Sequence, residues 1–290
     1  MAILVVGSTG KVGSLVVAAL LARGADVRAL TRDPSKASLP EGVSVVKGDL
    51  LDVDTMRQIL ADVTTLFLIN PVARDEHTQA LVTLGLARDA NVKGVVYLSM
   101  LNADAFLDTP HSSAKYAAEL MIEKYGIPAT ILRPTYFMQN DLLQKDALAN
   151  GFYAMPLGRR GVAMIDARDL AEVAAFELIR RQNAPESLPL ARIEVVGPDV
   201  MTGEDGAKIW SEVTGTEIVY AGDDLVALEK RIGSHSESWL AYDQALMFQG
   251  FHQDGMIPAE ESVQTLMETL GRPLRTYRSF VIEQAAAWNM

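Results

Sequence analysis

The feature that most constrains the fold is a turn with three glycines near the start of the chain. Gly7, Gly10 and Gly13 follow an apolar run, Ile3 to Val6, and precede a stretch with helical spacing of apolar residues. This order is typical of a dinucleotide-binding unit, because the glycines permit the turn, admit a pyrophosphate and let helix and strand pack closely. The expected contact residues are Gly7, Ser8, Thr9, Gly10, Lys11, Val12 and Gly13.

Strand and helix patterns alternate through the first two-thirds of the chain. Further short strands are predicted at residues 27–30, 43–46, 65–69, 94–99 and 129–132, and helices at 11–23, 76–90 and 111–125. Alternating elements of this kind form βαβ units with right-handed crossovers. We therefore expect an α/β fold of the Rossmann type, a doubly wound parallel sheet with helices on both faces.

The pattern changes after Pro134. Residues 137–150 are predicted to be helical, 152–155 and 162–165 to be short strands, 169–181 to be a helix and 192–196 to be a late strand of the main sheet. Helical patterns dominate from Met201, at 204–213, 236–248, 259–270 and 277–288. We predict an NAD(P)-binding domain over residues 1–155, with 160–200 adding a late helix and strand. A smaller, mainly helical substrate domain follows over 201–290.

Composition excludes several classes of protein. The 290 residues carry a formal net charge of -11 and no cysteine. The acidic balance argues against direct binding of nucleic acid, and the absence of cysteine excludes disulfides and thiolate ligands. It also fits a cytoplasmic protein. The four histidines are isolated, so no metal site is expected, and the longest apolar run, residues 15–22, is too short to span a membrane.

The end of the second strand bears on the choice of dinucleotide. NAD sites usually place an acidic residue there for the ribose 2′-hydroxyl, whereas this chain has Arg32, with Lys36 nearby. Arg32 can bind a 2′-phosphate through its forked guanidinium. NADP is therefore expected, although Asp33 keeps NAD open and Arg32 could instead be a solvated surface residue.

Two later strand ends also belong to the expected dinucleotide site. Asp49 and Leu50 follow the third strand, and Asn70 and Pro71 follow the fourth. Ligands of such sheets bind at the carboxyl ends of the strands. Asp49 could equally cap a helix that begins near Asp52.

These residues together resemble the NmrA-like family, atypical members of the short-chain dehydrogenase/reductase superfamily. The similar segments are the glycine turn, Thr31-Arg32-Asp33-Pro34, Gly48-Asp49-Leu50, Leu132-Arg133-Pro134 with Phe137-Met138 and Asn140, and the closing stretch from Ser279-Phe280 to Trp288. The resemblance implies the Rossmann fold and an NAD(P) cofactor. It also implies either an NAD(P)H-dependent reductase of quinones, dyes or phenolics, or a regulator that binds the dinucleotide without chemistry.

The superfamily's catalytic Tyr-x-x-x-Lys pair is altered here. His111 stands at the tyrosine position and Lys115 at the lysine position, four residues apart on one helix face. The resemblance implies that Lys115 contacts the nicotinamide ribose, with His111 as a proton donor or relay. Ser99 matches a polar position beside the substrate. His111 could instead be a polar residue of the first helical turn, and Ser99 a hydroxyl bonded to backbone.

The substrate is expected to be a small quinone-like, aromatic or carbonyl compound. Tyr136 and Phe137 follow the sixth strand and could wall an apolar pocket, although aromatic clusters at this spacing are more often core. Such an electrophile accepts hydride and can take its proton from water. The alternatives are a redox sensor acting through a partner protein and a sugar-nucleotide epimerase or dehydratase. A helix-rich surface is compatible with a homodimer.

Overall fold

A computed structural model describes residues 2–290. The chain divides into two compact units. The first unit comprises the residues up to Asp104, His111–Arg133 and Leu170–Ile193, and the second comprises Ala105–Pro110, Pro134–Asp169 and Glu194–Met290. The second unit therefore includes residues 134–155, which the sequence pattern assigns to the first domain, because the chain leaves the sheet at Pro134.

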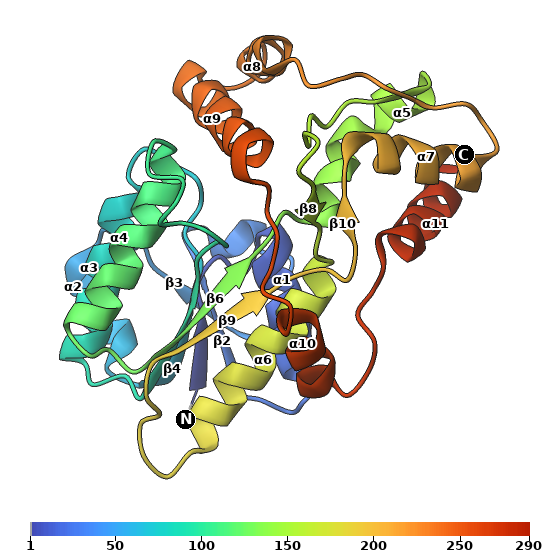
Figure 1. The fold of residues 1–290 in the computed structure, drawn as a ribbon. Coiled ribbons are helices and arrows are strands. Elements are labelled where there is room, and N and C mark those ends of the chain that lie inside the picture. Colours follow the sequence, from blue (N-terminus) through green and yellow to red (C-terminus); the bar gives the residue numbers. More distant parts are fainter. Residues whose placement is uncertain (1) are drawn as a thin grey trace. The chain divides into compact units, whose positions relative to one another are not determined.

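The first unit contains most of a seven-stranded sheet, counted over the described residues (Figure 1). Its strand order is β3-β2-β1-β4-β5-β6-β9. The bounds are β1 (Ala2–Val5), β2 (Val27–Thr31), β3 (Ser44–Lys47), β4 (Val63–Leu68), β5 (Gly94–Leu98), β6 (Ala129–Pro134) and β9 (Ala191–Val195). The pairs from β3 through β6 are parallel. The predicted Rossmann-type fold is confirmed, and the late strand β9 lies beside β6.

The strand order reverses between β1 and β4, and this reversal sets where a ligand can bind. After β1 the chain moves outward to β2 and β3, and it then returns to place β4 on the other side of β1. The loops that leave β1 and β4 therefore diverge and open a crevice at the carboxyl ends of these strands. The glycine turn leaves β1 at this point.

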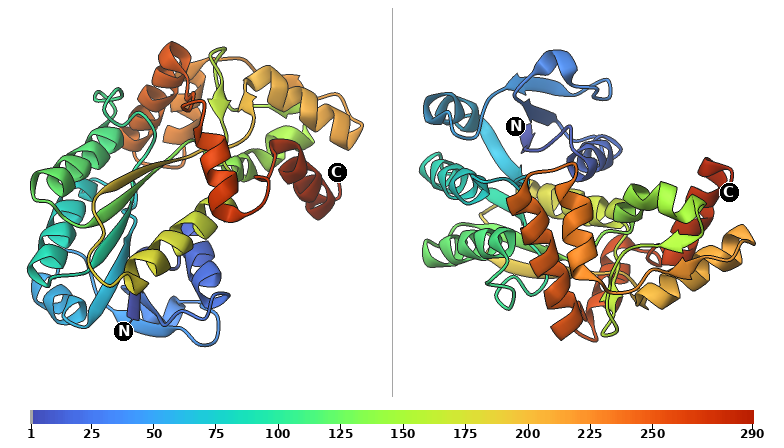
Figure 2. Two further views of the ribbon diagram at one scale, coloured as in Figure 1. Left: turned by 60° about the horizontal axis from the view of Figure 1, so that its bottom comes forward. Right: turned by 90° about the horizontal axis from the view of Figure 1, so that it is seen from above.

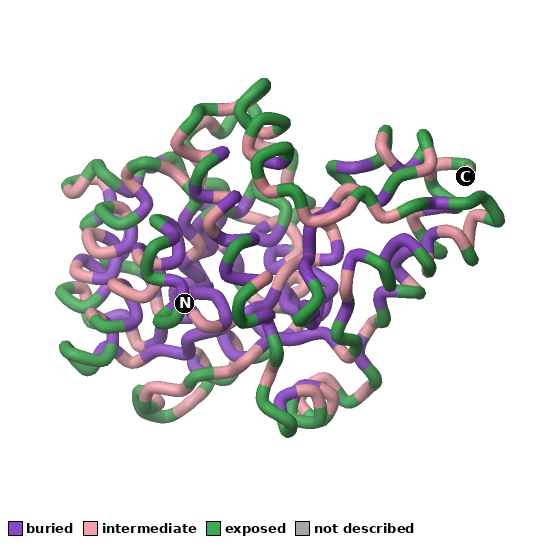
Figure 3. The backbone as a smooth tube through the Cα atoms, turned by 45° about the horizontal axis from the view of Figure 1, so that its top comes forward, coloured by how far each residue is buried: buried purple, intermediate pink, exposed green. Residues whose placement is uncertain are grey.

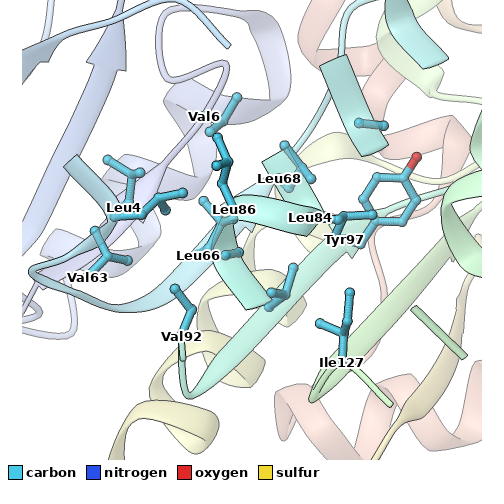
Figure 4. Close-up of a cluster of buried hydrophobic side chains, with 14 of the residues drawn as sticks. Leu4, Val6, Val63, Leu66, Leu68, Leu84, Leu86, Val92, Tyr97 and Ile127 are labelled. Carbon is cyan, nitrogen blue, oxygen red and sulfur yellow. The ribbon is translucent and has the colours of Figure 1, made fainter. Parts of the chain in front are cut away.

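Helices cover both faces of this sheet. Helices α2 (Val53–Leu60), α3 (Glu76–Asp89) and α4 (Pro110–Lys124) pack on one face, whereas α1 (Lys11–Leu21) and α6 (Ala167–Asn183) lie on the other (Figure 2). Leu66 and Tyr97 from the sheet meet Leu84 and Leu86 of α3 in the core of the first face (Figure 4). Strand β1 is buried throughout, as expected for a central strand, and the helices alternate between buried and exposed residues (Figure 3).

The second unit is mainly helical. Its elements are η2 (Met138–Gln144), α5 (Lys145–Ala149), α7 (Gly203–Thr214), α8 (Leu225–Gly233), α9 (Ser238–Asp254), α10 (Ser262–Leu270) and α11 (Tyr277–Trp288). Strand β10 (Val200–Met201) pairs antiparallel with β8 (Val162–Ala163), and β11 (Val219–Tyr220) pairs parallel with β7 (Phe152–Tyr153).

The helix predicted over residues 137–150 is split in two. Its first part, η2, is a 3-10 helix in which Met138, Asp141 and Gln144 are buried. A 3-10 helix has three residues per turn, so residues three apart share one side. The burial of this set fits the 3-10 geometry, and the α-helical turn resumes at Lys145.

Within residues 2–290, no helix is both long enough and apolar enough to cross a bilayer.

Candidate active site

The glycine turn between β1 and α1 forms a concave stretch of backbone, called the glycine cradle below. Gly7 has a φ of +68°, and the Gly10 N–H donates to the Gly7 carbonyl oxygen at 2.9 Å. A Cβ at Gly13 would lie 2.1 Å from that oxygen, so only glycine fits there. Among the described residues no side chain caps α1 at Gly10. The N–H groups of the first turn can therefore bind an anion.

A pocket of about 770 Å³ opens beside this turn. Every residue predicted to bind the dinucleotide lines it except Ser8 and Lys115. The predicted residues that line it are Gly7, Thr9, Gly10, Lys11, Val12, Gly13, Arg32, Lys36, Asp49, Leu50, Asn70 and Pro71. Residues that the sequence analysis did not single out as contacts are Val6, Leu30, Thr31, Asp33, Gly48, Ile69, Ala73, Asp75 and Gln79.

Ser8 is buried behind the turn. Its hydroxyl donates to the Leu30 carbonyl oxygen at 2.9 Å. Leu30 belongs to β2, so this hydrogen bond fastens the glycine turn to the neighbouring strand. The Ser8 side chain thus supports the shape of the turn from within the protein.

The rim of the pocket at the end of β2 is basic. Arg32 and Lys36 are exposed and line the pocket. Asp33 caps a short 3-10 turn, η1 (Pro34–Lys36), by accepting hydrogen bonds from the Ser35 hydroxyl at 2.6 Å and the Ser35 N–H at 3.1 Å. The Ser35 hydroxyl lowers the pKa of Asp33 from its ordinary value. The carboxylate is therefore engaged with its own turn, including the ammonium of Lys36 at 3.4 Å.

Asp49 and Asp52 have separate roles. Asp52 caps α2 and accepts from the Thr55 N–H at 3.1 Å, whereas Asp49 is exposed, lines the pocket and accepts from the Leu51 N–H at 2.9 Å. The helix cap considered for Asp49 therefore belongs to Asp52, and Asp49 stays available to a ligand.

Asn70 presents an unusual buried carboxamide. Asn70 is 3% exposed, and neither Nδ2 nor Oδ1 of its side chain has a hydrogen-bond partner within residues 2–290. A buried polar group without a partner carries a free-energy cost that a ligand can remove. Asn70 lines the pocket, so the orphaned amide fits a hydrogen-bonding ligand there. Together with the glycine cradle, it makes the pocket suitable for a dinucleotide.

Lys115 lies on the buried face of α4, outside the lining of this pocket. Its Nζ is 2.8 Å from Oε1 of Glu76, the first residue of α3. Glu119 lies one turn along α4 and points to different partners. It accepts from the Ser99 hydroxyl at 2.5 Å and from Nε of Arg133 at 3.1 Å. The carboxylates of Glu76 and Glu119 and the cations of Lys115 and Arg133 thus form one charged cluster, buried or half-buried near the ends of β5 and β6.

His111 and Ser99 are both buried near the start of α4 and the end of β5. Ser99 donates its hydroxyl to a carboxylate rather than to backbone, which leaves its oxygen as an acceptor. Tyr97 is fully buried, and desolvation, followed by the charges of Glu76 and Glu119, raises its pKa well above the ordinary value. Tyr97 therefore does not replace the acidic tyrosine missing at position 111.

Glu76 and Glu119 were not predicted from the sequence as site residues. One signal was available for Glu119, because positions 111, 115, 119 and 122 recur at helical spacing and include the apolar Ile122. A buried stripe that contains charged residues requires partners from other elements. Glu76 gave no such signal, since an acidic residue in the first turn of a helix is common for local reasons.

In the second unit, Tyr136 belongs to an aromatic cluster. Its ring meets Phe248 at 5.7 Å and Phe251 at 5.9 Å between centroids, both edge-on, and its hydroxyl lies 3.6 Å from the Met155 sulfur. Burial raises the pKa of Tyr136. Phe137 pairs with Ile165 in an isolated bridge. Tyr136 and Phe137 are mostly but not fully buried, and their contact with a substrate stays a prediction.

A model of the NmrA-like family matches residues 1–269. The chain belongs to the NmrA-like family. A curated relative, the NAD(P)H azoreductase of Xenophilus azovorans, is 29% identical over 295 residues, which cover 99% of each chain.

Two solved structures share the fold of this NmrA-like protein. The NADPH-dependent quinone oxidoreductase of Escherichia coli, solved with NADPH, has a TM-score of 0.85 at 23% identity and covers 98% of this chain and 99% of its own. The triphenylmethane reductase of Citrobacter sp., solved with NADP(H), has a TM-score of 0.83 at 22% identity and covers 98% of this chain and 100% of its own.

Proposed function

We propose that this NmrA-like protein is an NADPH-dependent reductase of small quinone-like, aromatic or carbonyl compounds. The observation that carries the proposal is the placement of the dinucleotide pocket and the buried Lys115–Glu76 pair at the carboxyl ends of neighbouring strands. The end-to-end similarity to an NAD(P)H azoreductase supports it. A Rossmann fold with a dinucleotide site would also suit a regulator that does no chemistry. The experiment must therefore test for the reaction itself.

NADPH, when bound, supplies a hydride to an electrophilic carbon, nitrogen or oxygen of the substrate. The N–H groups of the turn from Gly7 to Gly13 bind the pyrophosphate. Arg32 and Lys36 bind the 2′-phosphate that distinguishes NADPH from NADH, and the Asn70 amide donates or accepts a hydrogen bond inside the pocket. Lys115 is assigned to the hydroxyls of the nicotinamide ribose.

The residues present favour substrates that need no strong acid. His111 occupies the position where the superfamily has its tyrosine, and Tyr97 is a poor proton donor because burial raises its pKa. A quinone or an extended conjugated cation accepts hydride first and can take any proton from water or from His111. Tyr136 and Phe137 are proposed to contact the flat face of such a substrate.

Anaerobic consumption of NADPH and NADH, followed by absorbance, tests the proposal. The panel contains quinones, azo compounds, cationic triphenylmethane dyes, enones and aldehydes, and the variants are Lys115→Met and His111→Ala. Exposed Lys124 lies on the same helix, so Lys124→Met serves as the matched control. We expect turnover with NADPH preferred, and a loss of about tenfold or more in kcat/KM for Lys115→Met.

Tight NADPH binding without turnover across the panel would overturn the reductase and favour the regulator. Unchanged kcat/KM in Lys115→Met would remove the role assigned to Lys115. The cytoplasmic location and the homodimer stay predictions.

A further inference from the structure

Lys115 is held by a carboxylate from another helix. Glu119 stands four residues after Lys115 on α4 and would be its usual partner on a helix surface. The structure instead pairs Lys115 with Glu76 of α3 at 2.8 Å, while Glu119 binds Arg133 and Ser99. The direction of the Lys115 side chain is thus set from α3.

Glu76 lies within the segment that forms part of the wall of the dinucleotide pocket, although Glu76 itself does not line the pocket. Its N–H donates to the Ala73 carbonyl oxygen at 3.1 Å. Ala73 and Asp75 line the pocket just before Glu76, and Gln79 lines it one turn later. The Lys115–Glu76 pair therefore joins the segment that shapes the pocket to the helix that carries the lysine.

Burial makes this pair sensitive to the loss of either charge. The side chains of Lys115 and Glu76 are 10% and 3% exposed. An ammonium removed from water favours its neutral form unless an opposite charge lies close by. The carboxylate of Glu76 stands at the N-terminus of α3, where the helix dipole favours a negative charge. The other ionisable groups around the lysine are His111 and Glu119 on α4, Tyr97 on β5 and Arg133 on β6.

We propose that Glu76 is the positioning residue for Lys115: its carboxylate holds the lysine ammonium in the place from which it contacts the bound dinucleotide. The proposal rests on the proposed function, because it takes Lys115 as a contact of the dinucleotide. Glu76 itself acts through the lysine. Removing the carboxylate should therefore weaken dinucleotide binding only while Lys115 is present.

The test measures NADPH binding by the full chain with calorimetry, for the wild type, Glu76→Gln, Glu76→Asp, Lys115→Met and the double variant Glu76→Gln/Lys115→Met. We expect Glu76→Gln and Lys115→Met each to raise the Kd by about tenfold. The double variant should bind as Lys115→Met does. Glu76→Asp should recover part of the lost affinity, because it keeps the charge.

Steady-state kinetics separate positioning from a general structural effect. In Glu76→Gln the KM for NADPH should rise in parallel with the Kd, whereas a loss of folded protein would lower kcat and leave the KM for NADPH unchanged. Glu123→Gln is the matched control, since Glu123 is an exposed carboxylate of α4 paired with Arg192 at 2.7 Å.

Three outcomes would overturn the proposal: wild-type affinity in Glu76→Gln, losses that multiply in the double variant, or a lower kcat in Glu76→Gln without a rise in the KM for NADPH. If Glu76→Gln does not fold, the double variant, which removes both charges, is compared with Lys115→Met; weaker binding by the double variant contradicts the proposal. Wild-type binding and turnover by Lys115→Met would instead contradict the proposed function, whatever Glu76→Gln does.

Discussion

Gly13 lies against the carbonyl group of Gly7, with no room between them for a side chain. A Cβ on Gly13 would be 2.1 Å from the Gly7 oxygen and 2.6 Å from the Gly7 carbonyl carbon. This approach places the first turn of α1 directly on the loop that leaves β1. The shape of the dinucleotide pocket therefore depends on the missing side chain at position 13.

Gly13→Ala should disrupt the pocket. The new methyl group must push the backbone of the turn away, because a carbonyl oxygen cannot yield as a flexible side chain can. We expect loss of NADPH binding and a free energy of unfolding lower by about 2 kcal/mol or more. The control is Gly85→Ala in α3, where a Cβ would meet only Met121 at 3.7 Å. Gly85→Ala should keep binding and gain up to about 1 kcal/mol. Chemical denaturation and calorimetry measure both.

The sequence predicted this part of the molecule well because its determinants are local. The glycine spacing, the apolar run before it and the helical pattern after it lie within about twenty residues, and each signal agrees with the others. The buried strands and α3 and α4 were predicted for the same reason. The division into units was harder, because the chain returns to the sheet with α6 and β9 after forming part of the second unit.

Arg32→Ala should change the choice of dinucleotide. Arg32 is exposed at the pocket rim, while Asp33 is engaged by Ser35. We expect KM for NADPH to rise by about tenfold, since one charged hydrogen-bond donor to a phosphate is lost. KM for NADH should hardly change. Steady-state kinetics with both dinucleotides measure this, with exposed Arg57→Ala in α2 as the control. An equal rise for NADH would show that Arg32 does not bind the 2′-phosphate.

Asn70→Leu should separate binding from stability. The buried carboxamide has no partner within residues 2–290, so an apolar residue of similar shape removes a desolvation cost. Without dinucleotide, the free energy of unfolding should stay equal or rise by about 1 kcal/mol. NADPH binding should nevertheless weaken by about tenfold. Thr83→Val is the control, because the buried Thr83 hydroxyl also lacks a partner but lies away from the pocket lining. Thr83→Val should change the free energy of unfolding and leave NADPH binding unchanged.

A buried carboxylate in the second unit should make stability depend on pH. Asp141 accepts hydrogen bonds from the hydroxyls of Tyr153 and Tyr277, and Trp210 donates to the Tyr277 oxygen at 3.0 Å. Burial raises the pKa of Asp141 to about 6, against the opposing effect of these hydrogen bonds. An aspartate in an unfolded chain has a pKa of about 3.9. The folded state thus binds the proton more tightly.

The sign of the effect follows from this difference. The contribution of Asp141 to stability is fully present below the unfolded pKa and is lost as the pH rises through about 6. Between about pH 5.5 and about pH 7.5 the loss of this contribution should lower the free energy of unfolding by roughly 1 kcal/mol. Urea unfolding at several pH values measures this in the wild type and in Asp141→Asn, which should remove that component. The exposed Asp146→Asn should retain it. An equal slope in Asp141→Asn would contradict the assignment.

The ion pairs that Lys115 and Arg133 make with Glu76 and Glu119 show why the candidate site was harder to predict than the glycine turn. Lys115 was found from the resemblance of one helix to a known pattern, but its partner Glu76 lies 39 residues earlier in the chain. Local spacing would instead pair Lys115 with Glu119. Only the packing of α3 beside α4 and the approach of Arg133 from β6 decide which carboxylate each cation meets.

The most direct test of the account follows the hydride itself. The protein is supplied anaerobically with NADPH that carries deuterium in place of both hydrogens of the hydride-donating carbon of the nicotinamide, together with a cationic triphenylmethane dye. Mass spectrometry of the colourless product then shows whether the central carbon holds a deuterium that water does not exchange. The account predicts one deuterium per molecule of product and a slower rate than with ordinary NADPH. A colourless product without deuterium, or NADPH binding without reduction of any compound of the panel, would contradict hydride transfer by this protein.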